Sequence, residues 1–146
     1  MKIAISADHA GFELKKILVK YIEEMGHEVT DYGTDSTESI DYPDYAYAAA
    51  KTIGDGTNDM GIIICGSGVG VSITANKVKS VRAANCFNNE MAALARQHNN
   101  ANIICLGARF LTEEQSKEMV KTFFTTEFEG GRHQRRVDKI HSTTGC

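Results

Sequence analysis

The sequence has little of what several protein classes require. It contains one proline and no tryptophan, and no apolar run approaches the roughly 20 residues that a membrane-spanning helix needs. The net charge is −3, so no overall positive field favours nucleic acid or an anionic membrane as a partner. With 42% hydrophobic and 24% charged residues in a length of 146, we expect one globular domain over residues 1–146 that binds neither nucleic acid nor membrane.

The cysteine and histidine patterns exclude the common disulfide and metal classes. The four cysteines form no Cys-x-x-Cys pair, and no His-Glu-x-x-His motif or cluster of metal ligands is present. Cys65, Cys86 and Cys105 close or lie inside apolar runs, where free thiols are common core residues. Residues 1–6 lack the layout of a signal peptide. We therefore expect a protein of the reducing cytoplasm that uses no metal and no other cofactor.

Strand-like and helix-like patterns alternate along the chain. The apolar run at 60–65 is typical of a strand buried on both faces. Pro43 opens an Ala-rich helix where its missing N–H costs nothing, and Thr112 with Gln115 forms a capping-box signal. Strands are expected at 2–6, 28–32, 60–65, 81–86 and 102–106. Helices are expected at 14–25, in a segment that begins at 43, in a separate segment that follows the loop 66–70 and ends at about 77, at 90–97, and from 112 to about 128.

This order predicts an α/β fold: a single-domain, doubly wound, five-stranded parallel sheet in a Rossmann-like three-layer sandwich. Gly130 and Gly131 break the preceding helix, and residues 130–146 form a polar C-terminal segment with few apolar positions. We expect this segment to be helical and to dock on a partner subunit. Arg132 and Arg136, four residues apart, would share one helix face and could grip a phosphate, or they could be solvated surface charge.

In such sheets, ligands bind at the carboxyl ends of the strands, near the point where strand order reverses. That rule selects the loops at 7–11, 66–70 and 107–109. His98 and Asn99 lie just before the last strand, and the sequence leaves open on which side of the sheet they fall.

The glycine-rich loop Gly66-Ser67-Gly68-Val69-Gly70 is the most informative stretch. Its glycines would let the backbone approach a ligand and aim N–H groups at an anion. The spacing is not that of a dinucleotide or P-loop motif, and tight packing explains such a turn equally well. Cys65 directly precedes the loop, where N–H donors would favour a thiolate; the alternative is a buried strand-end cysteine.

Two further positions carry similar alternatives. Asp8 and His9 follow the first strand, and they are either site residues or a helix-capping aspartate beside a surface histidine. His98 ends a helix, where a histidine is usually structural.

With these residues in view, the chain resembles the type B ribose-5-phosphate isomerases of the ribose/galactose isomerase family. The match extends over essentially the whole chain and depends on five motifs in the same order. These are residues 6–12 (SADHAGF), 41–43 (DYP), 64–70 (ICGSGVG), 96–102 (RQHNNAN) and 129–137 (EGGRHQRRV).

The resemblance implies interconversion of D-ribose 5-phosphate and D-ribulose 5-phosphate, a reaction of the pentose phosphate pathway, without a cofactor. By this likeness Cys65 takes the C2 proton and returns it at C1 through a cis-enediolate, and Ser67 assists proton movement between O1 and O2. His98 opens the sugar ring, and Asp8 contacts the sugar hydroxyls. The remaining implied contacts are Tyr42 and Asn99 to the sugar, the loop N–H groups of Gly66, Gly68, Val69 and Gly70 to the developing anion, and His9, Arg109, Arg132 and Arg136 to the phosphate.

Family members form homodimers or dimers of dimers whose sites are completed by the partner chain, so the resemblance implies the same here. One subclass uses a glutamate base at the position of Val71, and this chain lacks it. Two alternatives stay open: a six-carbon aldose-phosphate isomerase acting on allose 6-phosphate or galactose 6-phosphate, and a non-catalytic sugar-phosphate-binding module on the same fold.

Overall fold

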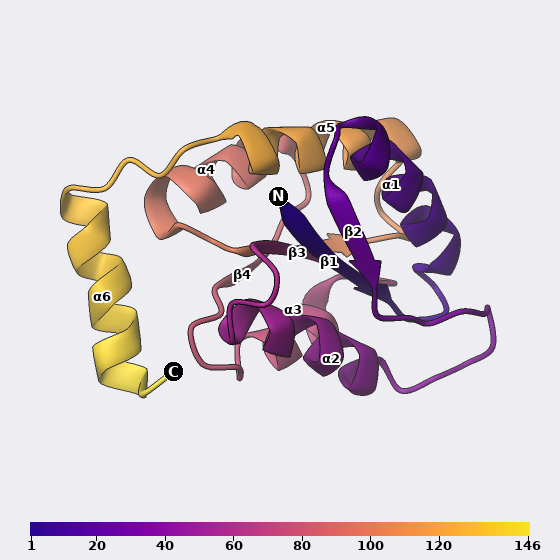
Figure 1. Ribbon diagram of the computed structural model, residues 1–146, viewed down its shortest axis with the longest axis horizontal. Helices are drawn as coiled ribbons and strands as arrows, with labels where there is room; N and C mark the ends of the chain where they lie inside the picture. The colour runs from indigo at the N-terminus through magenta and orange to yellow at the C-terminus, as the bar shows by residue number, and fades with distance from the viewer.

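Five parallel strands form one sheet in the order β2-β1-β3-β5-β4. The computed structural model describes all 146 residues, and Figure 1 shows its course. The elements are β1 (Lys2–Ala7), α1 (Phe12–Glu24), β2 (Glu28–Asp31), α2 (Tyr42–Gly54), β3 (Met60–Cys65), α3 (Val69–Ala75), β4 (Ala83–Asn85), α4 (Asn89–Asn99), β5 (Ile103–Gly107), α5 (Glu113–Thr125) and α6 (Arg132–Thr144). The predicted α/β architecture and all five strands are confirmed.

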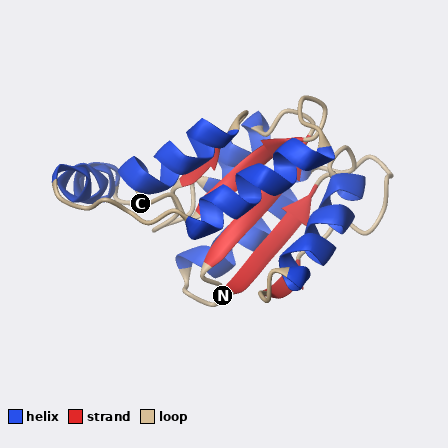
Figure 2. Cartoon of the chain, turned by 90° about the horizontal axis from the view of Figure 1, so that it is seen from above, coloured by secondary structure: helices blue, strands red, loops and turns tan.

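Helices cover both faces of the sheet, as Figure 2 shows. Side chains alternate along each strand, so Ile62 and Ile64 pack with α1, α4 and α5, whereas Ile63 and Cys65 pack with α2 and α3. Alanines at positions 46, 49 and 50 line the buried side of α2. Cys65 therefore belongs to the layer between the sheet and the pair α2 and α3.

Two predicted boundaries are wrong for identifiable reasons. β4 is shorter than 81–86 because side chains take the place of strand-to-strand backbone hydrogen bonds at its start. The Arg82 N–H donates to the Asn102 Oδ1, and the Asn76 side chain bonds both the N–H and the carbonyl of Ala83. α5 ends at Thr125 and not near 128, since Thr126 is extended. The other elements lie within two residues of the predicted ends.

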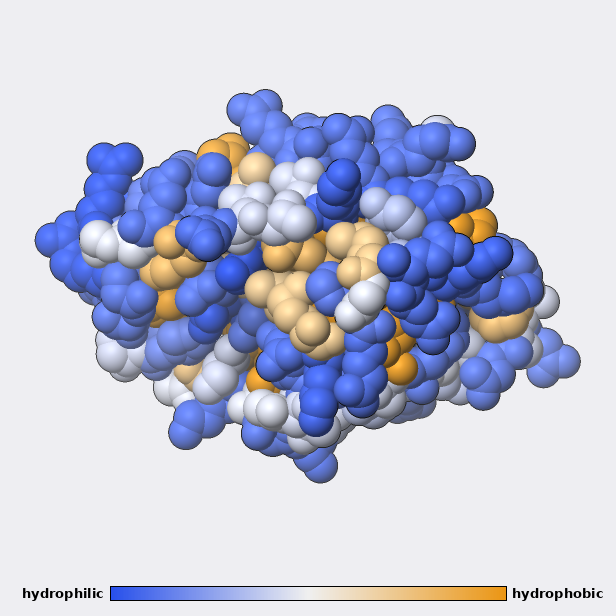
Figure 3. Space-filling view, turned by 45° about the horizontal axis from the view of Figure 1, so that its top comes forward, coloured by the Kyte–Doolittle hydropathy of each residue, from blue (hydrophilic) through white to orange (hydrophobic).

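The C-terminal helix α6 stands apart from the three layers, at the left of Figure 1. It packs against α4, and its buried residues are His133 and Val137. The predicted helix is thus confirmed, and its docking on a partner stays a prediction. No helix has both the length and the apolar character needed to cross a bilayer; Figure 3 shows a mostly hydrophilic face with a smaller apolar area at its centre.

Candidate active site

The strand order reverses between β1 and β3, which makes the crevice at their carboxyl ends the expected ligand site. The backbone N–H of Asp8 donates to the Ile64 carbonyl at 3.0 Å. A Cβ on Gly11 would lie 2.7 Å from the Ile64 Cγ2, so this position must be glycine for α1 to begin so close to β3. The loops after β1 and β3 therefore meet at one crevice, with Asp8 beside the end of β3.

Cys65 ends β3 at this crevice and is 5% exposed. The Gly68 N–H donates to its Sγ at 3.1 Å, so the sulfur lies against the backbone of the glycine loop. Burial raises the pKa of the Cys86 thiol to about 11 and that of Cys105 well above its ordinary value. Cys86 and Cys105 are free, buried core thiols, as the sequence predicted.

Neighbouring side chains press on the glycine loop from several sides. A Cβ on Gly66 would come within 3.1 Å of the Arg109 guanidinium, and one on Gly70 within 2.8 Å of the Tyr42 hydroxyl oxygen. The Ser67 Oγ accepts the Val69 N–H at 3.3 Å. Tight packing is therefore one reason for these glycines, and the same packing places Arg109 at the first residue of the loop after Cys65 and Tyr42 at its last.

Gly68 combines a left-handed backbone, φ +77°, with close packing, since a Cβ there would overlap the Asn85 Oδ1. We expect Gly68→Ala to cost about 1–2 kcal/mol of unfolding free energy and to lower turnover by roughly 10²-fold, because its N–H moves away from the Cys65 Sγ. Gly26→Ala is the matched control: its φ is +85° with nothing within 4 Å of the added Cβ. Thermal unfolding and kcat are measured on both variants. Both should lose stability from the strained backbone, but only Gly68→Ala should lose turnover. Equal kcat in the two would contradict a role of Gly68 at the active site.

Asp8 and His9 hold the neighbouring loops together. The Asp8 Oδ1 accepts the N–H groups of Ala10 at 2.9 Å and Gly11 at 3.0 Å. This turn precedes α1, whose N-cap is Gly11 with no side-chain cap. The helix-capping alternative for Asp8 is therefore wrong, because its Oδ1 bonds the turn that comes before the helix. The His9 Nδ1 accepts the Ile40 N–H at 3.4 Å, which joins the crevice to the loop before α2.

His98 and Asn99 lie at the amino ends of the strands, whereas Cys65 lies at the carboxyl ends. α4 begins after the carboxyl end of β4 and finishes before the amino end of β5, and a helix of its length spans roughly 16 Å. The Glu129 N–H donates to the Gln97 carbonyl at 3.1 Å, so the start of α6 lies beside them. One subunit thus holds two separate groups of predicted residues. The first is Asp8, His9, Tyr42, Cys65, Gly66, Ser67, Gly68, Val69, Gly70 and Arg109, and the second is His98, Asn99, Arg132 and Arg136.

The second group includes a histidine that the sequence analysis did not select. The His133 ring stacks on His98, with centroids 4.3 Å apart and planes 6° apart. The Glu129 Oε2 lies 3.4 Å from the His133 Nε2 and 4.0 Å from the His98 Nε2. Burial, and then the charge of His98, lower the pKa of His133. The four-residue spacing of Glu129 and His133, next to the start of a helix, was the sequence signal that could have indicated this contact.

These three side chains do not form a built metal site. Their ligand atoms lie within 4.8 Å of one another, but a metal must lie near the plane of each imidazole that binds it. Two stacked, nearly parallel rings have no such shared point, so their lone pairs do not converge on one ion.

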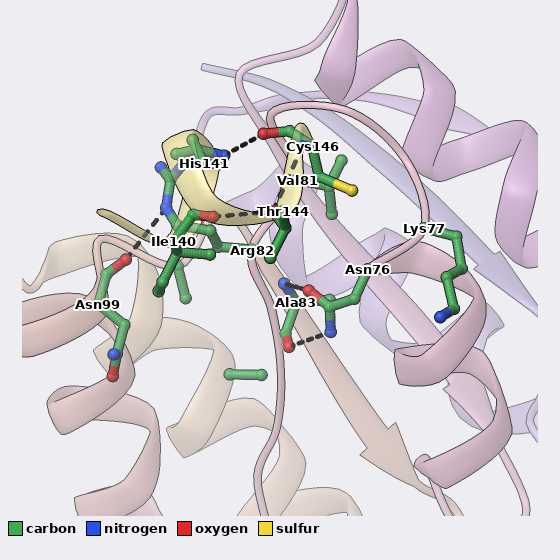
Figure 4. A pocket seen from close by; sticks show the side chains of 12 residues that line it. Asn76, Lys77, Val81, Arg82, Ala83, Asn99, Ile140, His141, Thr144 and Cys146 are labelled. Atoms are coloured by element: carbon green, nitrogen blue, oxygen red, sulfur yellow. Dashed lines mark hydrogen bonds between the residues drawn. The ribbon is translucent and has the colours of Figure 1, made fainter. Parts of the chain in front are cut away.

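A separate cavity of about 640 Å³ lies where α6 meets the body. Figure 4 shows Arg82 and His141 beside it, and the Arg82 guanidinium donates to the His141 Nε2 at 2.8 Å. Asn99 is the one predicted site residue in its lining. The cavity is therefore distinct from the crevice at Cys65.

Comparison with known proteins gives concordant results. Residues 3–140 match the family described as Ribose/Galactose Isomerase. The chain is 46% identical over 139 residues to ribose-5-phosphate isomerase B of Escherichia coli, covering 95% of this chain and 93% of that protein. It is 45% identical over 141 residues to the D-erythrulose-4-phosphate isomerase of Pectobacterium atrosepticum, covering 96% and 93%. The structure of ribose-5-phosphate isomerase B from Mycoplasma genitalium with bound ribulose 5-phosphate superposes with a TM-score of 0.96 at 44% identity, covering 99% of this chain and 96% of that one.

Proposed function

The chain belongs to the ribose/galactose isomerase family, and we propose that it interconverts D-ribose 5-phosphate and D-ribulose 5-phosphate as an aldose–ketose isomerase. The observation that carries the assignment of the base is the Gly68 N–H on the Cys65 Sγ, at the crevice between β1 and β3. A carbon acid next to a carbonyl needs a base and donors for the oxyanion that forms. The glycine loop supplies both within a few residues.

In the proposed reaction the Cys65 thiolate takes the proton from C2 of the open-chain aldose. The electron pair of that C–H bond forms the C1–C2 double bond while the π pair of the C1 carbonyl moves onto O1. The product is a cis-enediolate whose oxygens face the loop N–H groups from Gly66 to Gly70. The thiol then returns the proton to C1, and the Ser67 hydroxyl helps to move a proton between O1 and O2. No electron leaves the substrate, so the reaction needs no redox partner.

The remaining residues bind and open the sugar. Asp8 contacts the sugar hydroxyls through its Oδ2, which accepts no hydrogen bond within the chain. Its Oδ1 already holds the turn before α1. Tyr42 borders the sugar beside Gly70, and His9 and Arg109 hold the phosphate. Arg109 is exposed and lies over Gly66, and a guanidinium can bind phosphate through two N–H groups.

The second group of residues acts in the site of a neighbouring subunit. His98, the proposed acid for ring opening, lies at the end of α4 before the amino end of β5, whereas Cys65 of the same chain lies at the carboxyl end of β3. We infer a homodimer, or a dimer of dimers, in which His98, Asn99, Arg132 and Arg136 of one subunit complete the crevice of the other. The exposed, weakly packed α6 supports this arrangement.

The first test is turnover of D-ribose 5-phosphate to D-ribulose 5-phosphate in the presence of EDTA. We expect steady turnover that chelation does not change, because every proposed step uses side chains and backbone N–H groups. Loss of activity on chelation would contradict the cofactor-free mechanism. Absence of turnover with intact sugar-phosphate binding would contradict the isomerase proposal and favour a binding module.

Substrate length is a separate question within the same chemistry. A relative of 45% identity is named for a four-carbon phosphate, so overall similarity does not decide the chain length. Relative kcat/KM on erythrulose 4-phosphate, ribose 5-phosphate, allose 6-phosphate and galactose 6-phosphate decides it. We expect ribose 5-phosphate to have the highest value; a higher value on a six-carbon phosphate would move the assignment to that substrate.

A further inference from the structure

A lysine is buried in the helix that follows the first site loop. The residues of α1 that face the sheet are Lys15, Leu18 and Ile22, and Lys15 is 1% exposed. Its Nζ donates to both carboxylate oxygens of Asp31 at 2.6 Å and to the Thr34 carbonyl at 2.7 Å. A position that the helical pattern reserves for an apolar residue therefore carries a charge, with all three of its donors bonded.

This ion pair is poorly suited to a purely stabilising role. A buried pair gains little over an apolar replacement of similar volume, since desolvation offsets much of the attraction. The Asp31 side chain is 38% exposed, so water can solvate its carboxylate when the lysine is gone. What an apolar side chain cannot supply is the directed bond to the Thr34 carbonyl, which holds the chain leaving β2.

The held segment leads directly to the crevice. The Gly33 carbonyl accepts the Ala7 N–H at 2.7 Å, and the Thr34 N–H donates to the Ala7 carbonyl at 2.8 Å. This pairing extends the sheet to the residue before Asp8. Further along the same loop, the Ile40 N–H donates to the His9 Nδ1.

The other end of the loop enters α2 at Tyr42, whose hydroxyl lies against Gly70. A Cβ on Gly33 would come 2.6 Å from the Tyr45 ring, so α2 also packs on the segment that Lys15 holds. Lys15 thus links, through residues 33–41, to His9 on one side and to Tyr42 on the other.

We propose that Lys15 is a positioning residue for the substrate, holding the loop at 33–41 so that His9 and Tyr42 face the sugar phosphate. The proposal rests on the proposed function, because the roles of His9 and Tyr42 come from it. The Lys15 Nζ bonds Asp31 and Thr34 and not Cys65, so we expect its removal to act on binding and to leave the proton transfer intact.

The test compares Lys15→Met with Lys16→Met, an exposed neighbour on the same helix whose contacts are with Glu13 and the Phe12 ring. We expect Lys15→Met to raise KM for D-ribose 5-phosphate roughly 10- to 100-fold with little change in kcat, the pattern of lost uniform binding. Titration calorimetry with D-ribose 5-phosphate should show the same loss of affinity. Hydrogen exchange in peptides covering residues 32–42 should become faster. Lys16→Met should match the wild type in all three.

An unchanged KM and affinity in a folded Lys15→Met protein would overturn the proposal, and so would a loss confined to kcat. If Lys15→Met does not fold, Asp31→Asn decides. It changes an exposed side chain and weakens the ion pair that orients the Lys15 Nζ toward the Thr34 carbonyl, so it should raise KM in the same direction, and an unchanged KM would overturn the proposal. Calorimetry does not depend on turnover. A wild type that binds the sugar phosphate without converting it would contradict the proposed function and leave the comparison of Lys15 and Lys16 measurable.

Discussion

Replacing Cys65 by serine should lower kcat for D-ribose 5-phosphate by roughly 10²- to 10⁴-fold, the range that a positioned general base contributes. A serine hydroxyl fits the place of the thiol at the end of β3, and the Gly68 N–H can still donate to it. The hydroxyl is nevertheless far harder to deprotonate than a thiol, so the base is lost while the site's shape is kept. Steady-state kinetics and substrate calorimetry on the same protein separate the two effects: kcat should collapse and affinity should remain.

Cys86→Ser is the matched control for this experiment. Cys86 is also buried and follows a strand end, but burial raises its pKa to about 11, and its Sγ lies 3.6 Å from the Ala84 carbonyl, which a serine hydroxyl can also bond. We expect this variant to keep wild-type kcat. Full activity in Cys65→Ser would contradict the assignment of Cys65 as the base but not the proposed reaction. Equal losses of kcat in both variants would indicate a folding defect.

Mixing two inactive variants should restore activity if sites are shared between subunits. Cys65→Ser lacks the base, and His98→Asn lacks the ring-opening acid, so each is expected to be inactive alone on the ring form of the substrate. In a mixed dimer, one crevice combines the intact Cys65 of one subunit with the intact His98 of the other. Random pairing of equal amounts makes half the dimers mixed, with one intact site of two, so about a quarter of wild-type activity should return.

Coexpression of differently tagged chains, purified through both tags, isolates the mixed dimer, which should show about half of wild-type activity because one of its two sites is intact. The control is a mixture of Cys65→Ser with Gly68→Ala, both altered at the same crevice, which should stay near the activity of its parts. No recovery in the Cys65 and His98 mixture, from dimers shown to contain both chains, would contradict the shared site and require another route for His98.

Local sequence was sufficient for most of the fold. Apolar runs such as 60–65 predict buried parallel strands because both faces of the sheet are covered by helices. The capping box at Thr112 and Gln115 is present as predicted, since its two hydrogen bonds span three residues of the chain. The error at β4 falls where side chains from other elements bond the backbone at the strand's start.

The candidate site divides in the same way. The sequence by itself determined that Cys65 precedes a glycine loop at the carboxyl end of a strand, because that depends on chain order alone. Only the tertiary structure decided that His98 stacks on His133 and that Lys15 is buried against Asp31. The physical reason is that these contacts join residues 16 to 35 positions apart, whose distance depends on how the helices pack on the sheet and not on any pattern within one of them.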